Sequence, residues 1–299
     1  MSSSSVSYLR PELVKQIDRL DLKAKVIVEG FISGLHRSPY HGFSVEFAEH
    51  RKYEYGDDLQ NIDWSVYAKT DRLYIKKYKA ETNTECHLLL DISESMAFKY
   101  KSDLTKLDYS ICIAAALGYL MIRQSDPVGA VTFSDRVRNY VQPKSKKSHF
   151  YSFLKALAGI KPGGTTNLMR SLDEASLLIR KRGLVLIFSD FLQDIDQFSS
   201  AIHQLSYYGH DVVLFHVLDN AEVGLPYNDL IIFKNPETGE KVTTDAPSIR
   251  GDYTKAVKKY IDELRDTCIK FNAEYVFLDT STSFDKALMS FVMARSRKA

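Results

Sequence analysis

The sequence is poor in cysteine, and the cysteines that it has do not pair. Only three occur among 299 residues. They are Cys86, Cys112 and Cys268, which lie far apart and outside any Cys-x-x-Cys spacing. A disulfide framework needs an even set of cysteines, and a structural zinc site needs paired thiols or imidazoles. Neither feature is therefore expected in this chain.

A long hydrophobic run is also missing. The longest apolar stretch, residues 111–122, is well short of the roughly 20 residues that cross a bilayer as a helix. We expect it to form a buried helix. The first residues, Met-Ser-Ser-Ser-Ser-Val, have neither the basic region nor the apolar core of a secretory signal. The expectation is a cytoplasmic protein without a membrane span.

Neither sign of charge is in large excess. The chain has 40 Lys and Arg against 38 Asp and Glu, and the two signs alternate along it. A nucleic-acid partner is therefore not expected. Short basic runs at residues 144–147 and 295–298 are interpreted as solvated faces. Hydrophobic residues make up 44% of the chain, which is enough to build a compact core.

From Glu85 onward, short runs of Val, Ile, Leu and Phe alternate with longer segments of helical periodicity. This alternation predicts a doubly wound α/β fold, in which helices cover a mostly parallel sheet. The expected strands are residues 86–90, 128–133, 184–188, 212–218 and 275–278. The expected helices are residues 105–123, 147–158, 167–181, 195–207, 251–271 and 283–294.

One segment breaks this alternation. Residues 230–233 and 241–244 flank the turn Asn-Pro-Glu-Thr-Gly, a pattern that predicts a β-hairpin inserted near residues 225–247. We expect it to be an added edge element of a main domain that spans residues 85–299.

Residues 1–84 have a different texture. A charged helical stretch runs from Pro11 to about His36, and a polar, aromatic segment follows it. Because the apolar residues here are dispersed, we expect this segment to pack on the main domain instead of folding alone. Within it, residues 55–64 indicate a turn into a helix, with Asp57 as cap and Gln60 in the capping-box position.

Polar side chains follow two of the predicted strands. Asp91, Ser93 and Ser95 come directly after the apolar run that ends at Leu90, and Asp190 ends a second such run. Ligands of doubly wound sheets bind at the carboxyl ends of the strands. If the strands follow the order 3-2-1-4-5, these two are neighbours, and we expect the two carboxylates to converge.

A glycine loop lies between these two segments in the sequence. Gly163-Gly164-Thr165-Thr166 precedes a predicted helix, and its glycines allow the backbone to approach closely. With Thr165, the hydroxyls and the two carboxylates form an all-oxygen set, which suits Mg²⁺, with Mn²⁺ or Ca²⁺ as alternatives. Since hydroxyls are neutral, the ion keeps affinity for one more anionic oxygen, such as a partner's acidic residue.

These residues resemble a known metal site. Asp91-x-Ser93-x-Ser95, Thr165 and Asp190 are together similar to the metal-ion-dependent adhesion site of von Willebrand factor A domains. A wider resemblance is to the bacterial domain-of-unknown-function family 58. Its signatures here are Glu46-Phe47, Arg51-x-Tyr53, Gly56-Asp57-Asp58, Ile62-Asp63-Trp64 and Pro236-Glu-Thr-Gly239-Glu.

The family resemblance implies a partner. Such proteins resemble those encoded beside MoxR-type AAA+ ATPases, which implies an adaptor or substrate-recruiting role for the metal-site domain. The chain departs from the family at Gln60 and Asn61, where the family often has an arginine before Ile-Asp-Trp. A role based on charge is not expected at that position.

Two other functions compete with a non-enzymatic interaction module. One is a metal-dependent phosphohydrolase using Asp91, but such enzymes resemble a D-x-D pattern whose second Asp acts as acid and base. Here that position is Ser93, and a hydroxyl with an ordinary pKa does not replace the carboxyl. The other is an extracellular adhesive domain, against which the lack of a signal sequence and of disulfides argues.

Overall fold

The structure is a computed structural model that divides into two compact units. One consists of residues 1–34 and 84–299, and the other of residues 35–83. In the second unit, β1 (His50–Lys52) and β2 (Tyr74–Lys76) form an antiparallel pair. The segments that the structure describes are residues 10–35, 50–52, 74–76 and 84–296.

The predicted turn and helix at residues 55–64 lie outside the described residues, as do Gln60 and Asn61. The helical stretch predicted from Pro11 forms two helices, α1 (Pro11–Lys15) and α2 (Leu20–Leu35). Apolar residues of α2 recur at helical spacing and are buried in the first unit. They are Ala24, Ile27, Val28 and Phe31.

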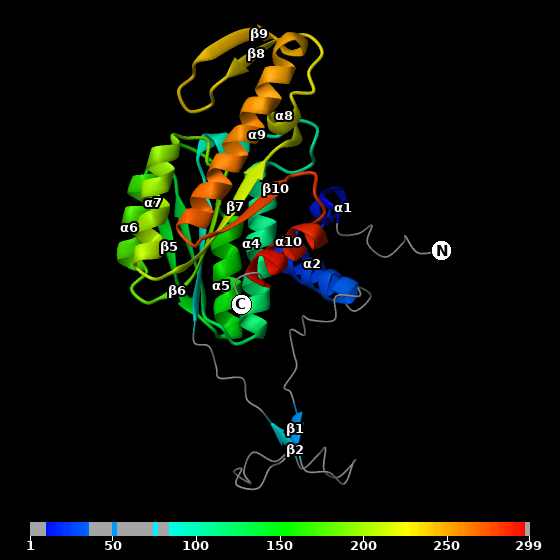
Figure 1. The fold of residues 1–299 in the computed structure, drawn as a ribbon. Helices are drawn as coiled ribbons and strands as arrows, with labels where there is room; N and C mark the ends of the chain where they lie inside the picture. Colours follow the sequence, from blue (N-terminus) through cyan, green and yellow to red (C-terminus); the bar gives the residue numbers. More distant parts are fainter. Residues whose placement is uncertain (1–9, 36–49, 53–73, 77–83, 297–299) are drawn as a thin grey trace. The chain divides into compact units, whose positions relative to one another are not determined.

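A six-stranded sheet forms the centre of the first unit (Figure 1). Its order is β10-β7-β6-β3-β4-β5, and all neighbouring strands are parallel except β4 and β5. Residues of β4 and β6 are buried throughout, since their unbroken apolar runs are covered on both faces. The strands are β3 (Glu85–Asp91), β4 (Val128–Phe133), β5 (Val137–Lys144), β6 (Gly183–Ser189), β7 (Asp211–Leu218) and β10 (Glu274–Asp279). The predicted doubly wound, mostly parallel α/β fold is confirmed.

Helices cover the two faces of this sheet (Figure 1). On one face, apolar side chains of α6, α7 and α9 share a core with Leu89 and Ile187 of the strands. On the other, α10 stacks Phe284 on Tyr109 of α4. The helices of this unit beyond α2 are α4 (Lys106–Arg123), α5 (Lys147–Ala158), α6 (Leu168–Leu178), α7 (Ile195–Tyr207), α8 (Asn220–Gly224), α9 (Ala246–Lys270) and α10 (Phe284–Ser296).

The predicted elements and the observed ones differ in several places. Strand β5 was not predicted, because one of its faces is largely exposed and its sequence is polar. Helix α9 begins at Ala246 instead of residue 251, where the Asp245 side chain caps it by accepting the N–H of Ser248. Helix α6 ends at Leu178, short of the predicted residue 181. The predicted hairpin is present as β8 (Leu230–Lys234) and β9 (Lys241–Asp245).

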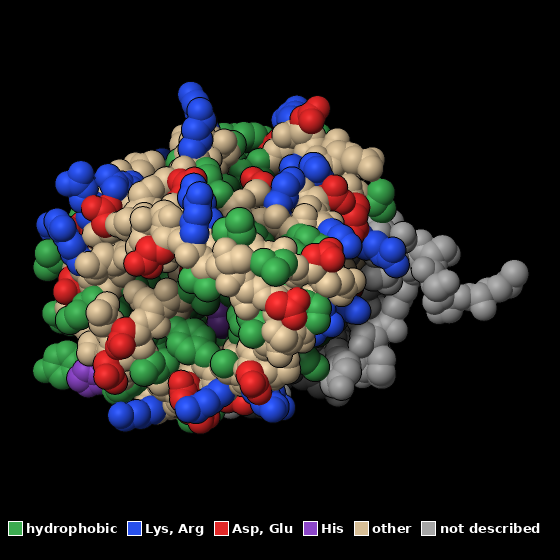
Figure 2. Space-filling view, turned by 90° about the horizontal axis from the view of Figure 1, so that it is seen from above, with side chains coloured by type: hydrophobic (Ala, Val, Ile, Leu, Met, Phe, Trp, Pro, Cys, Tyr) green, Lys and Arg blue, Asp and Glu red, His purple; other side chains and the backbone are tan. Residues whose placement is uncertain are grey.

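The three cysteines are buried in three different elements, β3, α4 and α9. Burial raises the thiol pKa of each of them to about 12. No helix in the described part of the chain is long and apolar enough to cross a membrane. Seen from above, side chains of both charges are interspersed over the surface, with hydrophobic side chains between them (Figure 2).

Candidate metal centre

The two strands that carry the candidate carboxylates are neighbours. Strands β3 and β6 pair in parallel, with Leu90 beside Phe188. Asp91 ends the first strand, and Asp190 directly follows the second. Both lie at the carboxyl edge of the sheet, at the point between β3 and β6 where the direction of the strand order reverses. The predicted adjacency of these strands is confirmed.

Asp91 is fully buried and held by two donors. Its Oδ1 accepts the Ser93 N–H at 2.9 Å, and its Oδ2 accepts the Ser189 hydroxyl at 2.6 Å. Burial and the nearby negative charge of Asp190 raise the pKa of Asp91 to about 7. The carboxylate is therefore oriented by two hydrogen bonds, but no cationic side chain of the described residues pairs with it.

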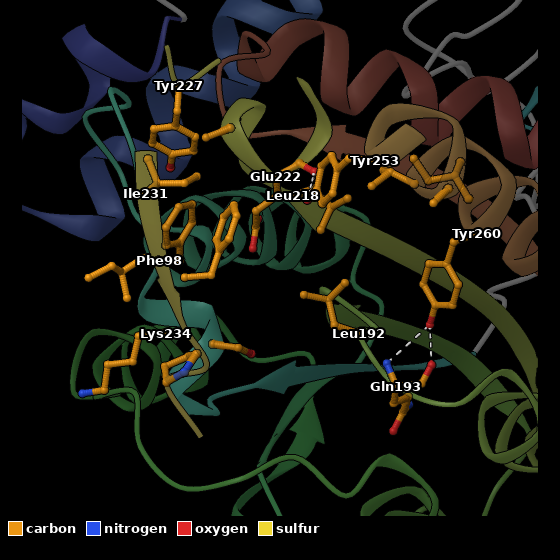
Figure 3. Close-up of a pocket in the computed structure, with 18 residues that line it drawn as sticks. Phe98, Leu192, Gln193, Leu218, Glu222, Tyr227, Ile231, Lys234, Tyr253 and Tyr260 are labelled. Carbon is orange, nitrogen blue, oxygen red and sulfur yellow. Dashed lines mark hydrogen bonds between the residues drawn. The ribbon is translucent and has the colours of Figure 1, made fainter. Parts of the chain in front are cut away.

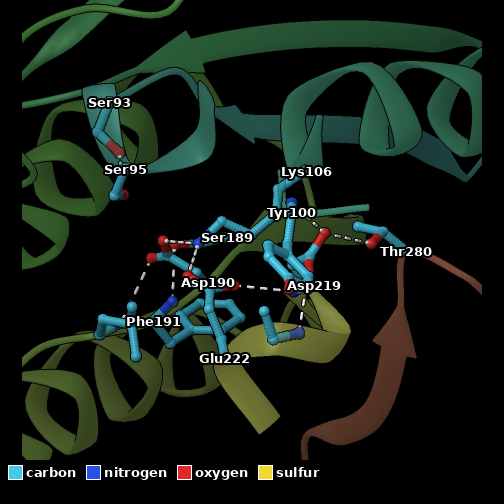
Figure 4. Close-up of polar contacts among 12 residues, drawn as sticks. Ser93, Ser95, Tyr100, Lys106, Ser189, Asp190, Phe191, Asp219, Glu222 and Thr280 are labelled. Atoms are coloured by element: carbon cyan, nitrogen blue, oxygen red, sulfur yellow. Dashed lines mark hydrogen bonds and ion pairs between the residues drawn. The ribbon is translucent and has the colours of Figure 1, made fainter. Parts of the chain in front are cut away.

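The two serines of the motif lie beside each other. The hydroxyl oxygens of Ser93 and Ser95 are 3.0 Å apart, within hydrogen-bond distance. Ser93 is buried, and Ser95 lies in the short 3-10 turn η3 (Glu94–Ala97). The Glu94 side chain is exposed. Two neutral oxygens are thus presented together at the loop (Figure 4).

Asp190 has an internal cationic partner, Lys106 (Figure 4). The Lys106 Nζ donates to Asp190 Oδ2 at 2.8 Å and to Glu222 Oε1 at 2.6 Å, and its side chain is 0% exposed. Burial alone would raise the pKa of Asp190, but the charge and hydrogen bond of Lys106 outweigh burial and hold that pKa below its usual range. The same two carboxylates raise the pKa of Lys106 against the opposing effect of its burial. The pair is therefore ionised.

Short helix α8 supplies the second carboxylate on Lys106. Its capping box places Glu222 Oε2 on the N–H of Asp219 at 2.8 Å. Asp219 in turn accepts hydrogen bonds from Ser102 and Thr280, so it joins loops that follow different strands (Figure 4). Burial raises the pKa of Glu222, and Lys106 partly offsets that effect.

Sequence reasoning did not find Lys106 or Glu222. Lys106 is the first residue of the apolar helix α4, and the residues that it contacts lie 84 and 116 positions away. The helix dipole disfavours a lysine at a helix N-terminus, so the unusual position of Lys106 was the one sign in the sequence that it has a special role.

The glycine loop lies against the loop of Asp91. The Gly163 N–H donates to the carbonyl of Ile92 at 2.7 Å, and the Glu94 N–H donates to the carbonyl of Gly164 at 3.0 Å. Gly164 has a φ of +86°, a conformation that favours glycine. The two loops are therefore held together by backbone hydrogen bonds.

The two threonines of that loop differ. Thr165 is exposed, and its side chain has no hydrogen-bond partner among the described residues. Thr166 is half-buried, and both its N–H and its hydroxyl bind Glu237 of the hairpin turn. Thr165 as a metal ligand therefore stays a prediction.

Ser134 anchors the same loop from the end of β4. Its carbonyl accepts the N–H of Asn167 at 3.0 Å and the hydroxyl of Ser171 at 2.9 Å. Ser134 thus ties the segment that follows the glycine loop to the end of β4.

The donor set fits a hard divalent cation. Its oxygens come from two buried carboxylates and from hydroxyls, and the one internal ammonium at the site is bound to Asp190. Within the described residues, no group of three or more His, Cys, Asp and Glu could hold a metal. A cation here would therefore depend on hydroxyl oxygens as well as on Asp91 and Asp190.

A cavity of about 1000 Å³ adjoins the site (Figure 3). The hairpin and α9 form its walls, and Ser95 and Leu192 reach it from the site loops. The loop of Leu192 is tied to α9, because the Tyr260 hydroxyl lies within hydrogen-bond distance of the carbonyls of Phe191 and Gln193 and shares its one proton between them. The lining is predominantly apolar, with Phe233 on the hairpin side.

Solved structures that are similar to this chain include two from Bacteroides. The protein BatB from Bacteroides thetaiotaomicron is 16% identical, with a TM-score of 0.48, and the match covers 72% of this chain and 100% of that chain. An aerotolerance-related membrane protein from Bacteroides fragilis is 18% identical, with a TM-score of 0.46, over 69% of this chain and 96% of that chain.

Sequence comparison gives the family. Uncharacterized proteins of Mycobacterium tuberculosis (Rv1480) and Mycobacterium bovis (Mb1516) are each 26% identical over 294 residues, which cover 97% of this chain and 92% of theirs. The family model described as "Protein of unknown function DUF58" matches residues 49–262. This chain therefore belongs to the DUF58 family.

Proposed function

We propose that this protein is a non-enzymatic, divalent-metal-dependent module for protein–protein interaction. Asp91, Ser93, Ser95, Thr165 and Asp190 would hold Mg²⁺, or Mn²⁺ or Ca²⁺ in its place. The observation that carries the proposal is the pair of buried carboxylates at adjacent strand ends, of which only Asp190 is bound to a cationic side chain of the described residues.

The chain's own residues prepare this site. Ser93 and Ser189 orient the Asp91 carboxylate, and Lys106 fixes one oxygen of Asp190. The ion would supply a positive charge at which a partner's carboxylate can bind. Because at most two protein charges face the ion, such a carboxylate would complete its coordination.

The partner that we propose is a MoxR-type AAA+ ATPase, or one of its client proteins, in the cytoplasm. Membership of the DUF58 family supports this proposal, since the resemblance that suggested the ATPase was to that family. The protein would act as an adaptor between the ATPase and the proteins that it remodels.

A pull-down with the tagged MoxR-type ATPase of the same organism tests the proposal. We expect binding of the wild type in Mg²⁺, and loss of binding in chelator or in Asp91→Ala. Asp252→Ala is the control, because the Asp252 side chain is 93% exposed and lies outside the site. Equal binding of wild type and Asp91→Ala would contradict metal-mediated docking.

A phosphohydrolase would use the same aspartate in another way. Here both Asp91 oxygens already accept hydrogen bonds, and the residue two positions on is Ser93. We expect no turnover of an aryl phosphate in Mg²⁺. Turnover by the wild type that is lost in Asp91→Ala would show that the protein is a phosphohydrolase and would contradict the non-enzymatic module.

A further inference from the structure

The tip of the β8–β9 hairpin places a carboxylate on the glycine loop of the candidate metal centre. The Thr166 N–H donates to Glu237 Oε2 at 2.8 Å, and the Thr166 hydroxyl donates to Glu237 Oε1 at 2.9 Å. Charge-assisted hydrogen bonds of this kind are roughly twice as strong as neutral ones. Thr166 therefore offers two donors to one carboxylate, and a residue 71 positions away occupies them.

The hairpin turn holds Glu237 in this position. Asn235 Oδ1 accepts the N–H of Glu237 at 2.9 Å and that of Thr238 at 3.2 Å. The Asn235 N–H donates to the carbonyl of Glu240, and Gly239 has the positive φ of +78° that the turn requires. Because the turn is ordered by its own hydrogen bonds, Glu237 reaches Thr166 at a small entropic cost.

The hairpin is not packed tightly behind this contact. Its two strands form a sheet of their own, and a two-stranded sheet is marginally stable by itself. Ile231 and Phe233 line the cavity between the hairpin and α9, where both are half-buried; Figure 3 shows Ile231 at its edge. Leu230 and Ile232 are 69% and 65% exposed. Few packing interactions therefore oppose release of the tip.

We propose that Thr166 is a carboxylate-binding site at the rim of the metal centre, and that Glu237 is its internal ligand, which an acidic side chain of the partner replaces. The identity of the partner rests on the proposed function, but the two donors of Thr166 bind a carboxylate without any metal. An internal competitor lowers the apparent affinity for an external carboxylate.

The experiment is an NMR titration of the Thr166 amide with acetyl-glutamate-amide, in chelator. We expect the resonance to shift at a half-saturating concentration at least threefold lower in Glu237→Ala than in the wild type. Glu240→Ala is the matched control, because Glu240 lies in the same turn and its side chain has no hydrogen bond to the loop in the described residues. Glu237→Gln keeps the side-chain length and should fall between the wild type and Glu237→Ala.

Acetyl-glutamine-amide is the control ligand, since it has the same shape without the charge. Equal half-saturation in wild type and Glu237→Ala, or no shift of the Thr166 amide in either, would overturn the proposal and leave Glu237 as a contact that holds the hairpin. Since this titration contains chelator, its outcome is independent of Mg²⁺ binding. If the wild-type protein does not bind Mg²⁺ in a separate measurement, that result contradicts the proposed function and leaves the carboxylate site at Thr166 standing.

Discussion

Asp91 carries a charge that the folded protein accommodates poorly without a cation. The pKa of its carboxyl is about 7 in the fold, against an ordinary value of 3.8. Because this pKa is raised, the stability that the protonated group contributes is present below about pH 4 and is lost as the pH rises to about 7.

We therefore expect Asp91→Asn to be more stable than the wild type at about pH 8 in chelator. The gain should be up to about 4 kcal/mol and should vanish near pH 4, where both side chains are neutral. Urea unfolding at both pH values measures it. Mg²⁺ should raise the melting temperature of the wild type and leave that of Asp91→Asn unchanged. A variant less stable than the wild type at pH 8 would refute the prediction.

Lys106 and Asp190 form a buried ion pair whose removal has two effects. We expect Lys106→Met to lower the free energy of unfolding by about 3–5 kcal/mol, since two carboxylates lose their cation. The variant should also bind Mg²⁺ more tightly, because the freed Asp190 oxygen no longer shares its charge with an ammonium. Denaturant unfolding and calorimetric titration measure the two effects.

Lys255→Met is the control for that substitution. The Lys255 side chain is 81% exposed and pairs with Asp252 on the surface, so its loss should cost less than about 1 kcal/mol. An unchanged Mg²⁺ affinity in Lys106→Met would show that the ammonium does not compete with the ion.

Among the individual residues of the site, the sequence predicted some and missed others. Asp91 and Asp190 were predictable, because each lies at the end of a short apolar run that is typical of a buried strand. Lys106 was not, because its contacts arise from distant segments that only the tertiary fold brings together. The metal-binding role of the predicted residues stays a prediction.

Among the elements, the pairing of β3 with β6 sets the position of both aspartates, and Gly183 allows these strands to approach. A Cβ added at Gly183 would lie 2.3 Å from the Glu85 carbonyl oxygen. We expect Gly183→Ala to destabilise the protein by about 1–3 kcal/mol, because the strand backbones must separate.

Gly251→Ala is the matched substitution. Gly251 lies in α9, and nothing is within 4 Å of its added Cβ. Alanine should stabilise the helix by about 0.5–1 kcal/mol. Thermal unfolding of the two variants compares them, and similar melting temperatures would contradict this account of the strand contact.

Buried strands were easier to predict than edge strands. β4 and β6 consist of unbroken apolar residues, since both faces of each are covered. β5 pairs with β4 but is largely exposed on one side, so its sequence needs no apolar run and carries no comparable signal. The hairpin was predictable because its turn residues are specific.

For the whole molecule, two buried histidines make the stability depend on pH in the opposite direction to Asp91. Burial lowers the pKa of His87 and His216 to about 4, so both are neutral in the fold. Because the pKa values of the two histidines are lowered, the stability that their neutral rings contribute is present above about pH 6.5 and is lost as the pH falls towards 4.

We therefore expect Asp91→Asn to lose more stability than the wild type between about pH 7 and pH 4.5, since the wild type gains stability over this range as Asp91 is protonated and the variant does not. Urea unfolding at several pH values measures this loss. The imidazole resonances of His87 and His216 should remain those of neutral rings down to about pH 5. A ring that titrates near 6.5 would show that its burial does not govern its ionisation.

The division of the chain could be predicted only in part. The alternation of strands and helices identified the α/β unit, and α2 belongs to it through its buried apolar stripe. The structure assigns residues 35–83 to a unit of their own. Nothing in the composition of residues 1–84 marks a boundary at Leu35, because charged and apolar residues are mixed on both sides of it.

The buried cysteines make the molecule its own reporter of local opening. Cys86 lies in the strand of Asp91, Cys112 in the helix that begins with Lys106, and Cys268 in the helix beside the hairpin. Because a buried thiol reacts only after its surroundings open, single-cysteine variants would time the opening of each element by their rate of labelling. An ion bound at Asp91 and Asp190 should slow the labelling of Cys86 and Cys112 more than that of Cys268.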